Sequence, residues 1–281
     1  FYTMVFWRYD LGENQLGPNL PQNIEKMEWV QVLRLDNNQF RGILPAGLNE
    51  LKNLNVLDLS NNQFTGPLPI LQNVEWNKIR TLKLAGNQFT GRIPGDLADR
   101  FPELTDLDLS DNLLTGSIPW KIELLPNLRS FAAHHNQLTG EIPEGIGYMN
   151  RLSLLDLQGN QLTGPIPTSF GNLPLQRLKL SNNRLSGPIP EELFSPNTQN
   201  LEILELANNQ FSGEIPAQIQ SLSSLSDLRL DGNRLTASDP DLRRFLAWQN
   251  PSWISSQRVP MLQVSLTHQD ISVWYFPANT D

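Results

Sequence analysis

A pair of adjacent histidines is the feature of this sequence that could most directly do chemistry. His134 and His135 lie in the segment FAAHHNQL, where the equivalent segments of the chain mostly carry Ser, Asn, Asp or Gly. We expect Asp108, Asp111 and Asp156 on neighbouring strands or turns. Imidazole and carboxylate groups that meet can bind a metal ion or titrate near neutral pH. The favoured interpretation is nevertheless a stray pair without a role, with ligand contact and metal binding as alternatives, and we predict neither metal nor cofactor.

Motifs of known enzyme classes are absent from the sequence. The chain has three His and no Cys, which excludes thiolate metal sites and cysteine nucleophiles and leaves little for a catalytic triad. No G-x-S-x-G elbow, H-E-x-x-H motif or glycine-rich phosphate loop occurs. Carboxylate pairs such as Glu191-Glu192 fit a solvated surface. We therefore predict that the chain is not an enzyme.

The charge balance limits the possible partners. The formal net charge is -8 and basic residues form no cluster, which argues against nucleic acid as a partner. No apolar stretch approaches the ~20 residues that a membrane helix needs, and no signal peptide is visible. We therefore expect neither nucleic-acid binding nor a membrane span.

The elements that position these side chains follow from an internal repeat. Equivalent asparagines recur about every 24 residues, a period typical of solenoid repeats. They are Asn14, Asn38, Asn62, Asn87, Asn112, Asn136, Asn160, Asn183, Asn209 and Asn233. Each unit reads L-x-x-L-x-L-x-x-N-x-L/F-x-G-x-I/L-P, so about ten repeats are predicted.

Each part of the unit has a physical reason. The L-x-L portion alternates with period two, which predicts a short strand with inward leucines, and stacked units then form a parallel sheet. The Asn amide can satisfy backbone groups inside the following turn, so the stacked asparagines form a structural ladder. The remainder of each unit, such as GLNELKN at 47–53, carries apolar residues at helical spacing, which predicts short helical turns on the convex side.

The repeat resembles the leucine-rich-repeat superfamily, and within it the plant-type subclass with N-x-L-T-G-x-I-P. The closest matches are NQLTGEIP at 136–143 and NQLTGPIP at 160–167, and the resemblance covers roughly 5–250. It implies a right-handed α/β solenoid with a concave parallel sheet and short helical or 3-10 turns on the convex side. The subclass occurs in plant receptor-kinase ectodomains, polygalacturonase-inhibiting proteins and surface proteins of bacteria and protists. It therefore also implies an extracellular or cell-surface location.

The ends of the chain depart from the plant pattern because they lack cysteine-paired caps. We expect a solenoid over 1–238, a helical cap over 239–258 and an apolar tail over 259–281 that forms a hairpin or begins another module. The cap resembles the cysteine-free cap of bacterial members. Its residues expected to cover the last coil are Leu242, Phe245, Leu246, Trp248 and Trp253. No N-terminal cap is recognisable, because Phe6, Tyr9 and Leu11 already occupy repeat positions.

The central outward row of the predicted concave strands alternates in charge, with one interruption. Its members are Asp10, Arg34, Asp58, Lys83, Asp108, Ala132, Asp156, Lys179, Glu205 and Arg229. Parallel strands lie about 4.8 Å apart, so these side chains are neighbours. They either pair with one another, at about 0–1 kcal/mol per exposed pair, or form a pre-ordered binding strip, and the two interpretations are compatible. The residues predicted to contact a partner are Arg34, Asp58, Lys83, Asp108, His134, Asp156 and Lys179.

A second row consists of hydroxyl side chains that follow the L/F position. Its members are Thr65, Thr90, Thr115, Thr139, Thr163, Ser186, Ser212 and Thr236. In plant-type members this region forms a flanking sheet, where Thr suits a strand edge. A regular Thr array could also order water, as in ice-binding proteins.

Together these features predict a non-catalytic recognition module that binds a protein or glycan partner through the concave face. The alternative is a structural or assembly unit of a larger surface protein or filament, whose partners would be other subunits that meet the uncapped N-terminal end or the tail. Ice binding through the Thr/Ser row is a minor alternative.

Overall fold

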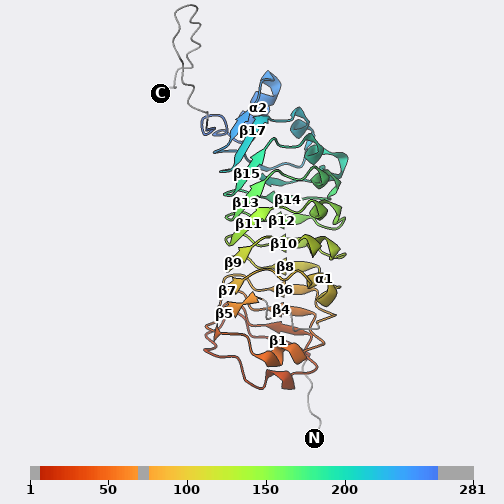
Figure 1. Cartoon of the computed structure of the whole chain (residues 1–281), viewed down its shortest axis with the longest axis vertical. Coiled ribbons are helices and arrows are strands. Elements are labelled where there is room, and N and C mark those ends of the chain that lie inside the picture. Colours follow the sequence, from red (N-terminus) through yellow and green to blue (C-terminus); the bar gives the residue numbers. More distant parts are fainter. Residues whose placement is uncertain (1–6, 69–75, 259–281) are drawn as a thin grey trace, which may run out of the picture.

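The computed structural model describes residues 7–68 and 76–258 of the chain. They form one elongated solenoid of stacked coils, with two sheets on one side and short helices on the other (Figure 1). The predicted leucine-rich-repeat architecture with a parallel concave sheet is confirmed. Phe6 and the tail interpreted at 259–281 lie outside the described residues. In the described ranges, no helix combines the length and the apolar character needed to cross a bilayer.

The concave sheet contains ten parallel strands, one from each coil. These strands are β1 (Arg8–Asp10), β2 (Val32–Arg34), β4 (Val56–Asp58), β6 (Thr81–Lys83), β8 (Asp106–Asp108), β10 (Ser130–Ala132), β12 (Leu154–Asp156), β14 (Arg177–Lys179), β16 (Ile203–Glu205) and β18 (Asp227–Arg229). The middle residue of each strand faces inward, whereas the two flanking residues face outward.

A second parallel sheet of nine strands flanks the first. Its strands are β3 (Arg41–Gly42), β5 (Gln63–Pro67), β7 (Gln88–Gly91), β9 (Leu113–Gly116), β11 (Gln137–Glu141), β13 (Gln161–Gly164), β15 (Arg184–Gly187), β17 (Gln210–Glu214) and β19 (Arg234–Thr236). This sheet carries the hydroxyl row, most of whose members are exposed.

Short helices form the convex side of the described coils, where the chain returns through the segment that follows the proline of the repeat. They are η1 (Ile24–Lys26), η2 (Ala46–Glu50), α1 (Leu97–Arg100), η4 (Trp120–Leu124), η5 (Glu144–Tyr148), η6 (Thr168–Asn172), η7 (Glu191–Phe194), η8 (Pro196–Thr198) and η9 (Ala217–Ser221), followed by α2 (Pro240–Gln249). Most are 3-10 helices of three to five residues, which suits a coil of about 24 residues that must turn back on itself.

One continuous hydrophobic core runs the length of the solenoid. Leu57 and Leu59 are fully buried, and their equivalents in other coils stack above and below them. Phe40, Phe64 and Phe89 stack in a row, with ring centroids 6.1 and 6.3 Å apart. No single coil could bury this surface alone, so the stacking of neighbouring coils supplies the stability of each.

The nine asparagines from Asn38 to Asn233 form a ladder of side-chain hydrogen bonds between adjacent coils. Asn160 is typical: its Nδ2 donates to the carbonyls of Ala133, Leu157 and Gln158 at 3.0, 3.0 and 3.3 Å. Its Oδ1 accepts the backbone N–H of Leu138 at 3.0 Å. Each ladder asparagine thereby satisfies backbone groups of its own coil and of the preceding one. Asn14, which has no described coil before it, is exposed and bonds only within its own turn.

The C-terminal end continues the ladder with other residue types. Gln257 Oε1 accepts the backbone N–H of Leu235 at 2.8 Å, and Gln257 Nε2 donates to the Leu230 carbonyl at 3.0 Å. Asn250 Oδ1 accepts the backbone N–H of Leu230 at 3.2 Å. The last coil therefore has its polar backbone groups covered by the segment that follows α2.

Packing of this segment differs from expectation at one residue. Leu242, Leu246 and Trp253 are buried against the last coil, and Phe245 is partly buried against it. Trp248 is 78% exposed, so the expectation that it covers the coil is wrong. In a helix that starts at Pro240, residues 242 and 246 lie one turn apart on one face, whereas residue 248 projects from the opposite side.

The N-terminal coil is less enclosed than the others. Tyr9 packs against the core and is partly buried, but Leu11 is 42% exposed. In the equivalent position of a later coil, Leu59 is fully buried because a coil lies on each side of it.

Replacing Asn160 with Ala should lower the free energy of unfolding by about 3 kcal/mol, because it leaves a buried N–H and buried carbonyls without partners. Asn14→Ala, the matched control, should cost less than about 0.5 kcal/mol because that amide is exposed. Urea unfolding followed by circular dichroism measures both values. Equal losses for the two variants would contradict a stabilising role for the ladder.

Candidate functional site

The concave sheet aligns the predicted charge row in one column. Strand pairing places Arg34 beside Asp58, Asp58 beside Lys83, and Lys83 beside Asp108. The same register continues through Ala132 and Asp156 to Lys179 and Glu205. The predicted contact residues other than His134 therefore stand on one surface, on successive strands that are interrupted once, at Ala132.

Members of the column differ in how far they pair with one another. Lys179 Nζ lies 3.2 Å from Glu205 Oε1, and Arg34 Nη1 lies 3.7 Å from Asp10 Oδ2. Lys83 is exposed and has no ion-pair partner among the described residues, although Asp58 and Asp108 flank it. The column is thus partly self-paired at its two ends and has an available ammonium group between them.

The aspartates of the column have a structural role that the sequence analysis missed. Asp58 and Asp108 each accept, through Oδ1, the backbone N–H two residues later, at 3.1 Å. Asp156 accepts the N–H of Gln158 in the same way at 3.3 Å. Asp is well suited to such local side-chain-to-backbone bonds. The recurrence of Asp at the strand end could therefore have predicted this role from the sequence. These bonds hold each carboxylate in a fixed direction.

Burial distinguishes Asp156 from the other carboxylates of the column. Asp156 is only 8% exposed. Desolvation raises the pKa of Asp156, and the nearby His134 and the hydrogen bond from Gln158 oppose this rise. Burial of Asp156 therefore costs the fold stability whenever its carboxyl group is ionised.

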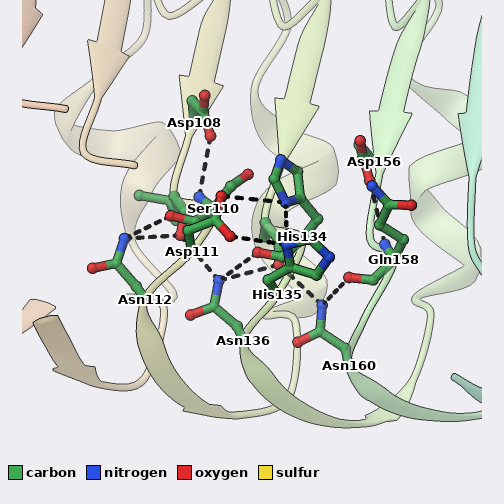
Figure 2. Close-up of polar contacts among 12 residues, drawn as sticks. Asp108, Ser110, Asp111, Asn112, His134, His135, Asn136, Asp156, Gln158 and Asn160 are labelled. Carbon is green, nitrogen blue, oxygen red and sulfur yellow. Dashed lines mark hydrogen bonds and ion pairs between the residues drawn. The ribbon is translucent and has the colours of Figure 1, made fainter. Parts of the chain in front are cut away.

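The histidine repeat brings three ionisable side chains together (Figure 2). His135 Nδ1 lies 2.8 Å from Asp111 Oδ1, and His134 Nδ1 lies 3.6 Å from Asp111 Oδ2. The two Nδ1 atoms are 3.3 Å apart, and the rings meet edge to face. Of the three expected carboxylates, Asp111 makes direct contact, whereas Asp108 bonds its own turn and Asp156 lies one strand further along. Ala133 is fully buried in place of the usual leucine.

Aliphatic residues beside the charge row were also missed by the sequence analysis. The first residue of each concave strand faces outward, and several of these residues are aliphatic and partly exposed. They are Val32, Val56, Leu154 and Ile203. The sequence did contain a signal for them, because the alternation of side chains along a strand places the residue before each L-x-L on the outward face. The concave surface therefore offers apolar area next to oriented charges.

The Asp156→Asn variant should be as stable as the wild type or more stable at pH 7, because Asn keeps the bond to Gln158 and removes the buried charge. The wild-type carboxyl binds its proton more tightly when folded, so its contribution to stability falls as pH rises above the ordinary pKa of 3.8 and through the raised folded value. The free energy of unfolding of the wild type relative to the variant, measured from pH 3 to pH 8, should decline with pH. A rise would contradict the direction of this pKa shift.

Several solved structures are similar to the chain along most of its length. The Arabidopsis receptor kinase HAESA, in complex with the peptide hormone IDA and a co-receptor, has a TM-score of 0.78 and 33% identity over 92% of this chain and 43% of that one. A TDR receptor has a TM-score of 0.76 and 32% identity, over 81% of this chain and 39% of that one. The chain thus spans about two fifths of these receptor chains.

A plant ice-binding protein is similar over a larger share of its own length. Its TM-score is 0.61 and its identity 27%, with coverage of 76% of both chains. No curated protein matches the chain.

The sequence also matches the family model described as Leucine Rich Repeat. The matched repeats are 29–51, 53–73, 78–99, 103–125, 151–173, 174–195 and 200–222. They cover more than half of the chain, and the unmatched internal repeat, 126–150, is the one that contains both histidines of the cluster. Because the matched repeats coincide with successive coils of the solenoid, and because the similar solved structures include plant receptor kinases, the chain belongs to the leucine-rich-repeat family, in its plant-type subclass.

Proposed function

We propose that this chain is a non-catalytic recognition module that binds a peptide or protein partner through its concave face. The observation that carries the proposal is the single column of oriented charges, with Lys83 exposed and not ion-paired among the described residues, beside the partly exposed Val32 and Val56. HAESA, which has the same fold, was solved with a peptide hormone and a co-receptor, and this supports a peptide or protein as the partner class.

The mechanism is binding by a rigid scaffold. The strands and the turn bonds of Asp58 and Asp108 fix the carboxylates before a partner arrives, so little side-chain entropy is lost on association. A partner that presents apolar side chains to Val32 and Val56 and an acidic group to Lys83 would match both the aliphatic pair and the charge column. The charges would serve mainly for orientation and association rate, and the apolar contacts for affinity.

We further propose that the module acts outside the cell or at its surface. The support comes from relatives described as receptor ectodomains.

The test compares two triple variants of equal charge. Arg34→Glu, Lys83→Glu and Lys179→Glu reverse the cations of the concave column, whereas Lys26→Glu, Lys52→Glu and Lys121→Glu reverse three exposed lysines in or next to the convex helices. Peptides selected from a display library on the wild type should lose at least about tenfold in affinity for the concave variant, or about 1.4 kcal/mol, and retain it for the convex variant.

Calorimetric titration of each selected peptide measures this difference, and sedimentation of each protein alone shows whether the chain associates with itself. Equal affinities for the two variants would contradict binding through the concave face. If the wild type bound glycans on an array and no peptide, the partner would be a glycan and not a peptide or protein. Self-association that neither variant alters would favour the assembly unit instead.

Ice binding is a second candidate, favoured by the similarity to a plant ice-binding protein and by the exposed threonines of the second sheet. Thr115, Thr139 and Thr163 lie on consecutive strands of that sheet. If this surface binds ice, the wild type should slow ice recrystallisation and replacing these three residues with Lys should abolish the effect. A wild-type protein that leaves ice growth unchanged would contradict this candidate.

A further inference from the structure

We infer that Asp111, His134 and His135 form a binding site for a divalent transition-metal ion such as Zn²⁺. The site is independent of the proposed peptide binding. It uses one carboxylate and two imidazole nitrogens from two adjacent coils, a ligand set that borderline metals such as Zn²⁺, Cu²⁺ and Ni²⁺ favour.

The distances among the three groups fit a shared ion. Zinc binds imidazole nitrogen and carboxylate oxygen at about 2.0–2.2 Å, so two ligands at a tetrahedral angle lie about 3.3–3.5 Å apart. The two Nδ1 atoms are 3.3 Å apart. The separations from Nδ1 to the Asp111 oxygens, 2.8 Å for His135 and 3.6 Å for His134, bracket the same value. Small movements of exposed side chains would therefore complete the geometry.

Proton placement gives a second reason to expect a cation. The two Nδ1 atoms, 3.3 Å apart, can hydrogen-bond to each other only when one of them carries a proton and the other does not, and an ionised carboxylate only accepts. A proton that His135 Nδ1 donates to Asp111, at 2.8 Å, is not available to His134 Nδ1. A metal ion accepts a lone pair from all three groups at once.

The local backbone aims these side chains at one another. His135 has φ of 51°, in the left-handed region that Asn and Asp occupy in several other coils. Asn61 at the equivalent position also reaches back one coil, to Asn37 at 3.0 Å, as His135 reaches Asp111. Gly159 occupies this position in the next coil, and a Cβ there would lie 2.4 Å from His135 Cδ2. The absence of that side chain leaves room for the imidazole ring.

Charge and solvent access complete the site. Asp108 and Asp156 stand on the adjacent strands and add to the negative potential that attracts a cation. Asp111 and His135 are exposed and His134 is half-buried, so the remaining coordination positions are open to water or to an outside ligand. An ion here would have three protein ligands.

The test uses substitutions that other coils already contain at these positions. His134→Ser, His135→Asn and Asp111→Asn together remove the ligands and keep residue types that suit the local backbone, as Ser60, Asn61 and Asn37 show. His268→Gln is the matched control, because it removes the third histidine of the sequence, which lies outside the described residues. Urea unfolding in the presence of a chelator checks that each untagged variant is folded.

Calorimetric titration with ZnCl₂ should give one site per wild-type chain, an affinity lower by more than about tenfold in the triple variant, and no change in His268→Gln. Titration with Co²⁺ should give the visible absorption of a nitrogen- and oxygen-bound ion in the wild type and not in the triple variant. The inference is overturned if the wild type binds no Zn²⁺, if the triple variant binds equally well, or if the loss follows His268 instead.

Discussion

The structure depends on the need to satisfy the polar backbone groups that turn inside each coil, away from water. After every concave strand the chain bends inward, and its N–H and carbonyl groups have no strand partner there. An asparagine amide supplies both a donor and an acceptor at this point. Because Asn160 bonds Ala133 and Leu138 of the preceding coil as well as its own turn, it also sets how two coils stack. Repetition of this contact keeps the outward positions in straight columns.

Because equivalent outward residues stand in straight columns, these residues determine what the surface of the solenoid can bind. Inward positions accept little change, since Leu57, Leu59 and their equivalents fill a common core, whereas residues such as Lys83 or His134 can vary without disturbing the stack. Equivalent outward positions on adjacent strands are neighbours, so substitutions one repeat apart combine into a surface. The paired histidines illustrate this, because they meet Asp111 only through the spacing of one coil. The N-terminal and C-terminal coils require separate solutions, as Gln257 and Asn250 show.

The period of the asparagines was enough to predict the coils, the concave sheet and the charge column, because one spacing determines all of them. Finer properties depend on directions in space that the period does not contain. Asp156 is buried and Asp58 is not, although both follow the same pattern. The ring of His135 turns towards Asp111 because the backbone of His135 is left-handed. Whether Trp248 faces the last coil or the solvent depends on the residue at which α2 starts. The similarity of the repeats thus predicts the scaffold well and the individual contacts less well.

The most direct test of this account is native-state hydrogen exchange at the backbone amides that donate to the ladder, such as those of Phe64, Leu138 and Phe211. If the asparagines bind neighbouring coils together, these amides should exchange as slowly as the amides of the concave strands and only through unfolding of whole repeats. Exchange at rates typical of exposed turns would show that the ladder does not hold the coils in register, and would contradict the account.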